Sequence, residues 1–238
     1  MPLSALKYFR AYLLDLIFPK FCLGCKKEGM WLCPDCQAAI KANTDKTCPI
    51  CKQINENGSV CGSCRKKSYL DGLWVLADYD DRLIQDLIKA IKYDYICELS
   101  ANFGCLAEKY FAGLPLNKEN LFLLPMPLHR RRQLERGFNQ AEIIAGSIGK
   151  IMGLPLIDPL LVRKKYLKAQ AKLSREERIA NIRSAFSFNK RFLAVSKLSR
   201  IILVDDVYTT GATMQECAKI LKNEGFNNVW GLVVARGN

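Results

Sequence analysis

The chain has 238 residues, of which half are hydrophobic and a quarter are charged, and its formal net charge is +13 at pH 7. These proportions are ordinary for a soluble protein, and they exclude a disordered polar chain. The length is sufficient to bury a core and to form one main domain and a smaller module. The charge is not ordinary. It indicates a polyanionic partner such as nucleic acid or a polyphosphate substrate, with an unspecific basic surface as the alternative.

The N-terminal residues place apolar side chains at helical spacing, which predicts an amphipathic helix over residues 1–20. Lys7, Arg10 and Asp15 interrupt the apolar pattern, the stretch is short for a membrane span, and no small-residue cleavage site follows it. We therefore expect no transmembrane segment and a cytoplasmic location, where thiols stay reduced. The helix packs on its own protein or docks on a partner or a membrane surface.

Four Cys-x-x-Cys pairs lie in the next segment, which we expect to form a double zinc ribbon over residues 21–68. Each pair can present two thiolates to one metal, and four sulfurs complete a closed tetrahedral site, so two structural zinc ions are expected. Reduced thiols in the cytoplasm argue against disulfides. Either the first four and the last four cysteines share one metal each, or the pairs interleave. The expected ligands are Cys22, Cys25, Cys33, Cys36, Cys48, Cys51, Cys61 and Cys64.

Residues 69–238 read as alternating strands and helices, which predicts an α/β domain. Residues 201–204 are four consecutive apolar residues, as a strand covered on both faces of a parallel sheet requires. Cys97, Cys105 and Cys217 lack partners at ligand spacing and are expected in the core. The other expected strands are residues 70–79, 121–124, 185–188 and 228–235, and the expected helices are residues 82–93, 99–111, 141–152 and 214–223.

A basic segment follows the strand over residues 121–124. Residues 129–183 carry thirteen Lys and Arg against five acids, and the planar fork of arginine suits a pyrophosphate. We expect a loop here, with His129 as a cap or a solvent-exposed group, and a short helix from a capping box at Ser174. Phe138 and Tyr166 are candidate platforms for base stacking. The candidate phosphate and nucleic-acid contacts are Arg130, Arg131, Arg132 and Arg136, and further nucleic-acid contacts are Lys168, Lys172, Arg175 and Arg178.

The strand over residues 201–204 ends in two carboxylates, Asp205 and Asp206, and leads into small and hydroxylated residues before the last helix. Gly211 lets the backbone approach a ligand, and the helix start faces an anion with its N–H groups. Neither a Walker A loop nor a dinucleotide fingerprint is present. The order of residues is similar to the phosphoribosyl pyrophosphate (PRPP) motif of type I phosphoribosyltransferases; an ordinary turn capped by Thr213 is the alternative. The candidate PRPP-binding residues here are Val207, Tyr208, Thr209, Thr210, Gly211, Ala212 and Thr213.

Taken together, the cysteine pairs and the later motifs resemble the ComF (ComFC) family. The motifs are residues 125–129, residues 136–140, Gln170 with residues 173–178, and residues 204–213. The resemblance implies a double zinc ribbon followed by a type I phosphoribosyltransferase-like domain over residues 69–238, with an open, mostly parallel sheet flanked by helices. It also implies a role in natural competence, the handling of incoming single-stranded DNA, and partners such as the ComFA helicase.

Similarity to phosphoribosyltransferases implies that Asp205 and Asp206 contact the ribose hydroxyls and Mg²⁺, and that residues 209–213 hold the 5′-phosphate. The four arginines would stabilise the leaving pyrophosphate. Two hypotheses follow: a DNA-uptake protein that uses the PRPP pocket, and a phosphoribosyltransferase of nucleotide metabolism with no DNA role. A zinc-stapled scaffold with a vestigial pocket is a third. Turnover and the acceptor substrate stay open.

Overall fold

The computed structural model describes residues 19–114, 116–157, 159–165, 184–190 and 196–237. Its centre is a four-stranded sheet in the order β1-β6-β5-β2, in which every neighbouring pair is parallel. Their carboxyl ends therefore meet at one edge, where open α/β sheets place ligands. These strands are β1 (Gly72–Asp78), β2 (Leu121–Pro125), β5 (Arg200–Tyr208) and β6 (Asn228–Arg236). A separate antiparallel pair is formed by β3 (Leu161–Arg163) and β4 (Phe186–Phe188).

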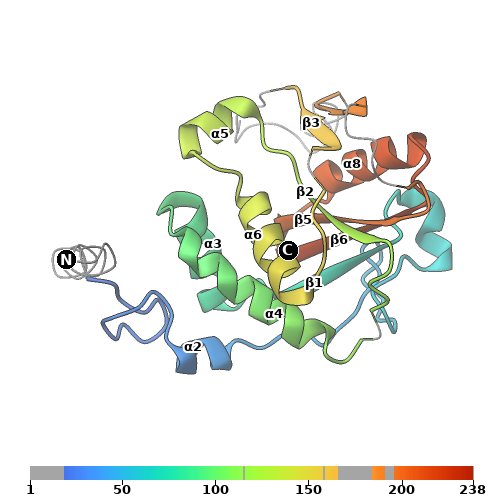
Figure 1. Cartoon of the computed structure of the whole chain (residues 1–238). Coiled ribbons are helices and arrows are strands. Elements are labelled where there is room, and N and C mark those ends of the chain that lie inside the picture. The colour runs from blue at the N-terminus through green and yellow to red at the C-terminus, as the bar shows by residue number, and fades with distance from the viewer. Residues whose placement is uncertain (1–18, 115, 158, 166–183, 191–195, 238) are drawn as a thin grey trace.

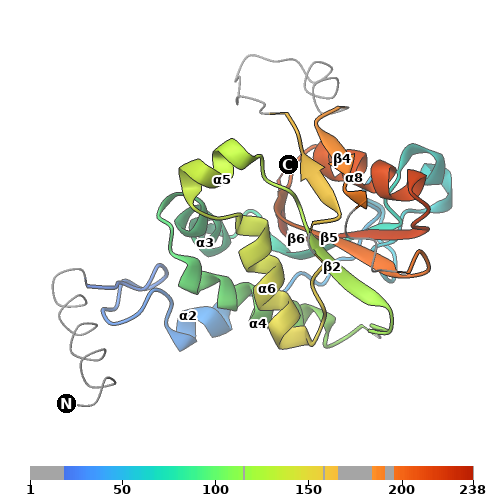
Figure 2. The same cartoon turned by 45° about the horizontal axis from the view of Figure 1, so that its top comes forward.

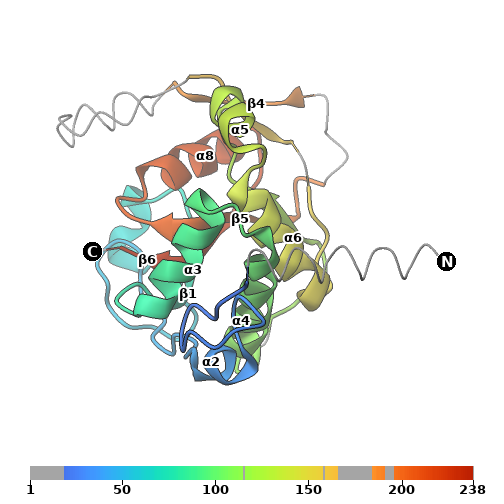
Figure 3. The ribbon, with the colours of Figure 1, turned by 90° about the vertical axis from the view of Figure 1, so that its left-hand side faces the viewer.

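Helices cover both faces of the parallel sheet (Figures 1 and 3). In β5, Ile202 and Val204 belong to the core shared with α3, α4 and α6, whereas Ile201 and Leu203 belong to the core shared with α8. A strand buried on both faces needs a continuous apolar run, and residues 201–204 supply it. The predicted open, parallel sheet flanked by helices is confirmed. The helices are α3 (Arg82–Tyr93), η2 (Cys97–Ser100), α4 (Ala101–Phe111), α5 (Arg130–Arg136), α6 (Gln140–Met152) and α8 (Ala212–Asn223).

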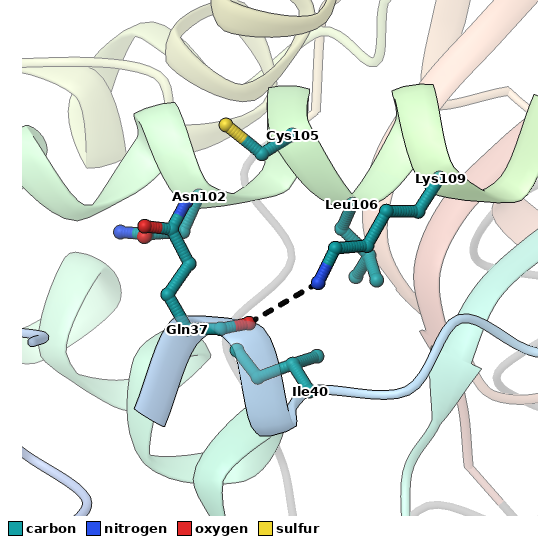
Figure 4. A pocket seen from close by; sticks show the side chains of 6 residues that line it. All are labelled: Gln37, Ile40, Asn102, Cys105, Leu106 and Lys109. Atoms are coloured by element: carbon teal, nitrogen blue, oxygen red, sulfur yellow. Dashed lines mark hydrogen bonds between the residues drawn. The ribbon is translucent and has the colours of Figure 1, made fainter. Parts of the chain in front are cut away.

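The first cysteine-rich segment packs on α4 through α2 (Pro34–Ala39). Figure 4 shows the contact, in which Lys109 Nζ donates to the carbonyl oxygen of Gln37 at 3.4 Å. Lys109 Nζ also donates to Ala38 O at 3.4 Å. Ile40, at the end of α2, is buried and belongs to the core that includes Leu106 of α4. This segment thus shares the apolar core of the main domain.

The second cysteine-rich segment, which includes η1 (Gly62–Lys67), covers the edge strand β1. Gly58 O accepts from Leu73 N at 2.9 Å, and the indole Nε1 of Trp74 donates to Asn57 O at 2.9 Å. The unpaired backbone groups of an exposed edge strand can pair with another chain. This segment occupies some of these groups on β1. Both ribbon segments are therefore built into the domain surface.

Three details differ from the sequence predictions. First, β5 extends to Tyr208 and so includes both acids, because its partner β6 continues to Arg236, opposite Tyr208. Second, the basic segment expected as a loop contains the short helix α5, which the side chain of His129 caps and Gly137 ends at φ 79°. Third, Cys97 and Cys105 are only half-buried, whereas Cys217 lies in the core as expected.

Several sequence predictions lie outside the described residues. They are the helix over residues 1–20, except for its last two positions, the capping box at Ser174, and Tyr166. The same holds for the nucleic-acid contacts Lys168, Lys172, Arg175 and Arg178. The domain boundaries stay predictions. Within the described ranges, no helix has the length and apolar character needed to cross a bilayer.

Candidate functional site

The turn between β5 and α8 is built around Gly211. This residue has φ +72°, in the left-handed region, and it immediately precedes the first turn of α8. A Cβ added to Gly211 would lie 2.0 Å from Oη and 2.2 Å from Cζ of Tyr208, whose ring is buried. Both the backbone angle and the contact with Tyr208 therefore require glycine.

A pocket opens at this turn, lined by Asp205 and by every residue from Val207 to Met214. Thr209 and Thr210 are exposed, and Thr210 Oγ1 accepts from Ala212 N at 3.4 Å. The start of a 12-residue helix contributes N–H groups and the positive end of its dipole. The pocket thus combines hydroxyl and amide donors with a carboxylate, a set that suits a phosphorylated sugar.

The acidic pair, Asp205 and Asp206, lies in the last part of β5. Asp206 is 5% exposed, and its Oδ2 lies 2.8 Å from Nζ of Lys92 on α3. This ion pair balances the charge of the buried carboxylate, although within the described residues Oδ2 is without a hydrogen bond. The acceptor capacity that the carboxylate has left suits a sugar hydroxyl or a hard cation such as Mg²⁺.

Asp205 titrates unusually high for a carboxyl group. Burial and the neighbouring charge of Asp206 raise the pKa of Asp205 to about 7, although the N–H of Asp206, which donates to Asp205 Oδ1 at 2.9 Å, opposes the shift, as do Lys92 and Arg163. The carboxyl keeps partial solvent contact, which moderates the effect. Perturbed acids of this kind gather at functional sites.

The raised pKa of Asp205 predicts a pH dependence of stability. Because the folded-state pKa lies above the unfolded value, the folded protein binds more protons between about pH 4 and 7, and Asp205 lowers the free energy of unfolding as pH rises through this window. We expect Asp205→Asn to be more stable than wild type at pH 8 by about 2 kcal/mol and equally stable near pH 4. Urea unfolding at the two pH values measures the difference in stability between the variant and wild type. An equal difference at both pH values would contradict the raised pKa of Asp205.

The four candidate pyrophosphate arginines, Arg130, Arg131, Arg132 and Arg136, lie on α5, and none of them lines the pocket. Arg131 pairs with Glu135 at 3.0 Å, and Arg136 Nη1 donates to Gln140 Oε1 at 3.0 Å. His129 Nδ1 accepts from Arg131 N at 3.1 Å, so His129 caps the helix, as expected. Asn139 anchors the start of α6, since its Nδ2 donates to Met126 O at 3.0 Å. The predicted pyrophosphate role of Arg130, Arg131, Arg132 and Arg136 stays a prediction.

Arg163, at the end of β3, is a cation that the sequence did not single out. Among the described residues its buried Nε finds no hydrogen-bond partner, and its guanidinium carbon lies 5.4 Å from the ring centroid of Phe186. Burial and the charge of Arg132 lower the pKa of Arg163, while Asp205 acts in the opposite direction. Arg163 is thus electrostatically coupled to both the acidic pair and α5.

The eight predicted zinc ligands form two groups in sequence order, Cys22 to Cys36 and Cys48 to Cys64. Within each group the four Sγ atoms lie within 4.8 Å of one another. The Cys25 and Cys33 sulfurs are 3.6 Å apart, as are those of Cys51 and Cys61. Tetrahedral zinc with bonds of about 2.3 Å requires about 3.8 Å between sulfurs. The residues therefore fit two zinc ions, and the interleaved pairing is wrong.

The two groups share a local turn. Cys22 N donates to Lys27 O at 2.8 Å, and Cys48 N donates to Gln53 O at 2.8 Å; Lys26 and Lys52 occupy the same left-handed position, with φ of 63° and 62°. Burial alone would raise the pKa of Cys22, but backbone N–H groups outweigh it and lower the pKa to about 6. In the same group, the hydrogen bond with Cys33 and burial raise the pKa of Cys36 to about 12, so zinc binding has to displace protons from the group.

Known proteins match both parts of the chain. Residues 13–65 match the double zinc ribbon domain family. The chain is 31% identical over 231 residues to Competence protein F of Haemophilus influenzae, and the alignment covers 90% of this chain and 96% of that protein. The chain belongs to the ComF family. It is also 27% identical over 201 residues to Competence protein ComFC of Bacillus subtilis, covering 82% of this chain and 79% of that protein.

Another relative of this ComF-family chain is DNA utilization protein YhgH of Escherichia coli K12, 28% identical over 223 residues, 88% of this chain and 94% of that protein. Among solved structures, a glutamine PRPP amidotransferase from B. subtilis overlaps 57% of this chain and 26% of its own, with TM-score 0.37 and 14% identity. An adenine phosphoribosyltransferase from Trypanosoma brucei overlaps 60% of this chain and 55% of its own, with TM-score 0.36 and 17% identity.

In this ComF-family protein the second ribbon contacts the back of the pocket. Arg236 Nη2 donates to Pro49 O, inside the second cysteine group, at 3.0 Å. The guanidinium carbon of Arg236 lies 5.5 Å from the ring centroid of Tyr208, and this ring packs under Gly211. A chain of contacts therefore runs from the second zinc site to the Gly211 turn.

The site includes two residues that sequence reasoning missed, Lys92 and Arg163. Lys92 is an ordinary polar position on an amphipathic helix, and Arg163 is one cation in a basic segment. Neither has a local sequence signal, because each reaches the acidic pair only through the packing of its element at the carboxyl edge of the sheet.

Proposed function

We propose that this ComF-family protein acts in natural competence, binds PRPP with Mg²⁺ in the pocket at the end of β5, and handles incoming single-stranded DNA in the cytoplasm. One observation supports the PRPP-binding part of this proposal. Asp205 and the turn at Gly211, which precedes the helix α8, line the same pocket. A phosphate needs the turn and a ribose diol needs the acids, so the two halves match the two ends of a phosphoribosyl group.

Each part of the pocket has a separate task in this proposal. The hydroxyls of Thr209 and Thr210 and the N–H groups of α8 hold the 5′-phosphate. Asp205 and Asp206 accept hydrogen bonds from the ribose hydroxyls or ligate Mg²⁺ through carboxylate oxygens. When bound, Mg²⁺ supplies positive charge that offsets the pyrophosphate. Lys92, at 2.8 Å from Asp206, positions the buried acid and compensates its charge.

The DNA part rests on charge and on the relatives. The net charge of +13 favours a polyanion, and exposed arginines of α5 lie on the surface near the carboxyl edge. Related proteins are named for competence and for DNA utilization. Other competence proteins, such as the ComFA helicase, are the expected protein partners.

The PRPP part is tested by calorimetry on zinc-replete protein with Mg²⁺. Asp205→Asn with Asp206→Asn keeps the shapes of both side chains and removes two charges. We expect PRPP binding at least 30-fold weaker than wild type, because each charge-assisted hydrogen bond contributes about 1.5 to 3 kcal/mol. Repeating the titration with single-stranded DNA measures whether the two ligands are coupled.

A matched control is Glu108→Ala with Glu119→Ala, which removes two exposed charges without touching the pocket. This control should bind PRPP within about twofold of wild type, since surface charges contribute little. Wild-type protein that binds no PRPP would refute the pocket assignment. PRPP binding with no DNA binding would instead favour a phosphoribosyltransferase of nucleotide metabolism.

A further inference from the structure

Two tyrosines at the end of α3 are exposed. Tyr93 is the last residue of α3 and is 63% exposed, and Tyr95 is 53% exposed. Tyr95 has φ +61°, a left-handed angle that costs a non-glycine residue about 1 to 2 kcal/mol. The chain thus tolerates strain at a position whose large aromatic ring is left in solvent. We call Tyr93 and Tyr95 the tyrosine platform.

Neighbouring side chains hold the platform in place. The guanidinium carbon of Arg136, on α5, lies 5.8 Å from the ring centroid of Tyr93. The ring of Phe138 meets that of Tyr95 edge to face, with centroids 5.9 Å apart and an interplanar angle of 86°. Two segments far apart in the chain therefore meet here, namely the end of α3 with its following turn and the α5–α6 junction, which Figure 2 shows together.

The end of α3 is tied to β5 through Lys92. This residue precedes Tyr93 directly, and its Nζ lies 2.8 Å from Asp206. The ion pair therefore fixes the end of the helix that carries the platform. Phe138, which the sequence indicated as a stacking platform, is half-buried and supports Tyr95 from the side.

Arg136 is the cation in contact with the platform. Arg130 and Arg132 lie on the same short helix, α5, and Arg131 of that helix is paired with Glu135. Asp94, between the two tyrosines, is the opposing exposed acid. Exposed aromatic rings interleaved with arginines are the combination that binds single-stranded nucleic acid, because bases stack on the rings and phosphates pair with the cations.

We propose that Tyr93 and Tyr95 stack against bases of single-stranded DNA at the end of α3, with the arginines of α5 contacting the phosphates. This inference rests on the proposed DNA function and locates the strand at the contact between α3 and the α5–α6 junction. Stacking on the tyrosines supplies affinity that does not depend on salt, and the α5 arginines supply the part that does.

The test is fluorescence anisotropy with a labelled oligothymidylate of about 15 nucleotides, on the full zinc-replete chain, from about 50 to 200 mM salt. Tyr93→Ala with Tyr95→Ala should weaken binding at least tenfold at every salt concentration and leave the slope of log K against log salt unchanged. Tyr93→Phe with Tyr95→Phe should bind within about threefold of wild type, since stacking on a ring contributes about 1 to 3 kcal/mol per base with or without a hydroxyl.

Two comparison variants separate the contributions. Tyr69→Ala removes another exposed tyrosine, whose ring has Lys219 Nζ 5.7 Å from its centroid, and should bind as wild type does. Arg130→Gln with Arg132→Gln should flatten the salt slope by about 1.4, or 0.7 for each phosphate contact. An undiminished affinity in the double alanine variant, or an equal loss in the double phenylalanine variant, would overturn the platform alone. Absence of DNA binding by wild type would overturn the proposed DNA function as well. The PRPP titration tests the small-molecule part of the proposed function independently of this result.

Discussion

Gly211→Ala is expected to abolish detectable PRPP binding and to lower the free energy of unfolding by about 3 kcal/mol or more. The left-handed φ of +72° costs alanine about 1 to 2 kcal/mol. The new methyl group would also overlap the ring of Tyr208, 2.0 Å away at Oη. This ring is buried and has Arg236 on it, so it has little room to retreat. Relief of the overlap therefore requires the turn itself to move, which displaces the N–H groups that face the phosphate.

Gly153→Ala is the matched control for Gly211→Ala. Gly153 ends α6 with φ +67°, and a Cβ there would meet nothing within 4 Å. This variant should lose only the backbone cost of about 1 kcal/mol and bind PRPP normally. Urea unfolding measures the stability of both variants, and calorimetry measures their PRPP binding. The comparison separates the backbone cost of the left-handed φ from the overlap with the ring of Tyr208. Equal destabilisation by the two substitutions would contradict the role assigned to Tyr208.

Zinc removal is expected to have the other large effect. Structural zinc contributes about 10 to 16 kcal/mol of apparent binding free energy in small ribbons, and the described cysteine-rich segments have little apolar core of their own. Wild-type protein should contain two zinc ions per chain, and Cys22→Ser or Cys48→Ser should each contain one. Elemental analysis measures the zinc, and thermal unfolding should show a loss of at least 10 °C in each variant, equivalent to several kcal/mol.

The two zinc variants should differ in ligand binding. Cys48→Ser loosens the segment whose Pro49 O accepts from Arg236, and Arg236 packs on Tyr208 under the Gly211 turn. PRPP affinity should therefore fall in Cys48→Ser and be largely kept in Cys22→Ser, measured below the unfolding temperature. Cys97→Ser is the control, since Cys97 belongs to neither sulfur group and should leave both zinc ions in place. Retention of both zinc ions in the Cys22 or Cys48 variant would refute the ligand assignment.

Local patterns in the sequence predicted much of this molecule. The zinc ligands can be recognised in the sequence because a metal knuckle needs two thiolates at fixed spacing within one short turn. The apolar run over residues 201–204 predicted a strand buried on both faces, and the following acids and glycine predicted a turn that faces a ligand. These features are encoded within a few residues of one another, so one stretch of sequence suffices.

The tertiary structure alone decided the rest. It paired the cysteines in sequence order and extended β5 through the acidic pair, because β6 continues beside it. It also brought Lys92 to Asp206 and placed Arg163 where its charge lowers the pKa of Asp205. The sequence by itself determined which residues are able to bind zinc, phosphate and a sugar diol. Which other side chains complete the site depends on the packing of distant elements at one sheet edge, and contacts between residues far apart in the chain leave no local pattern to read.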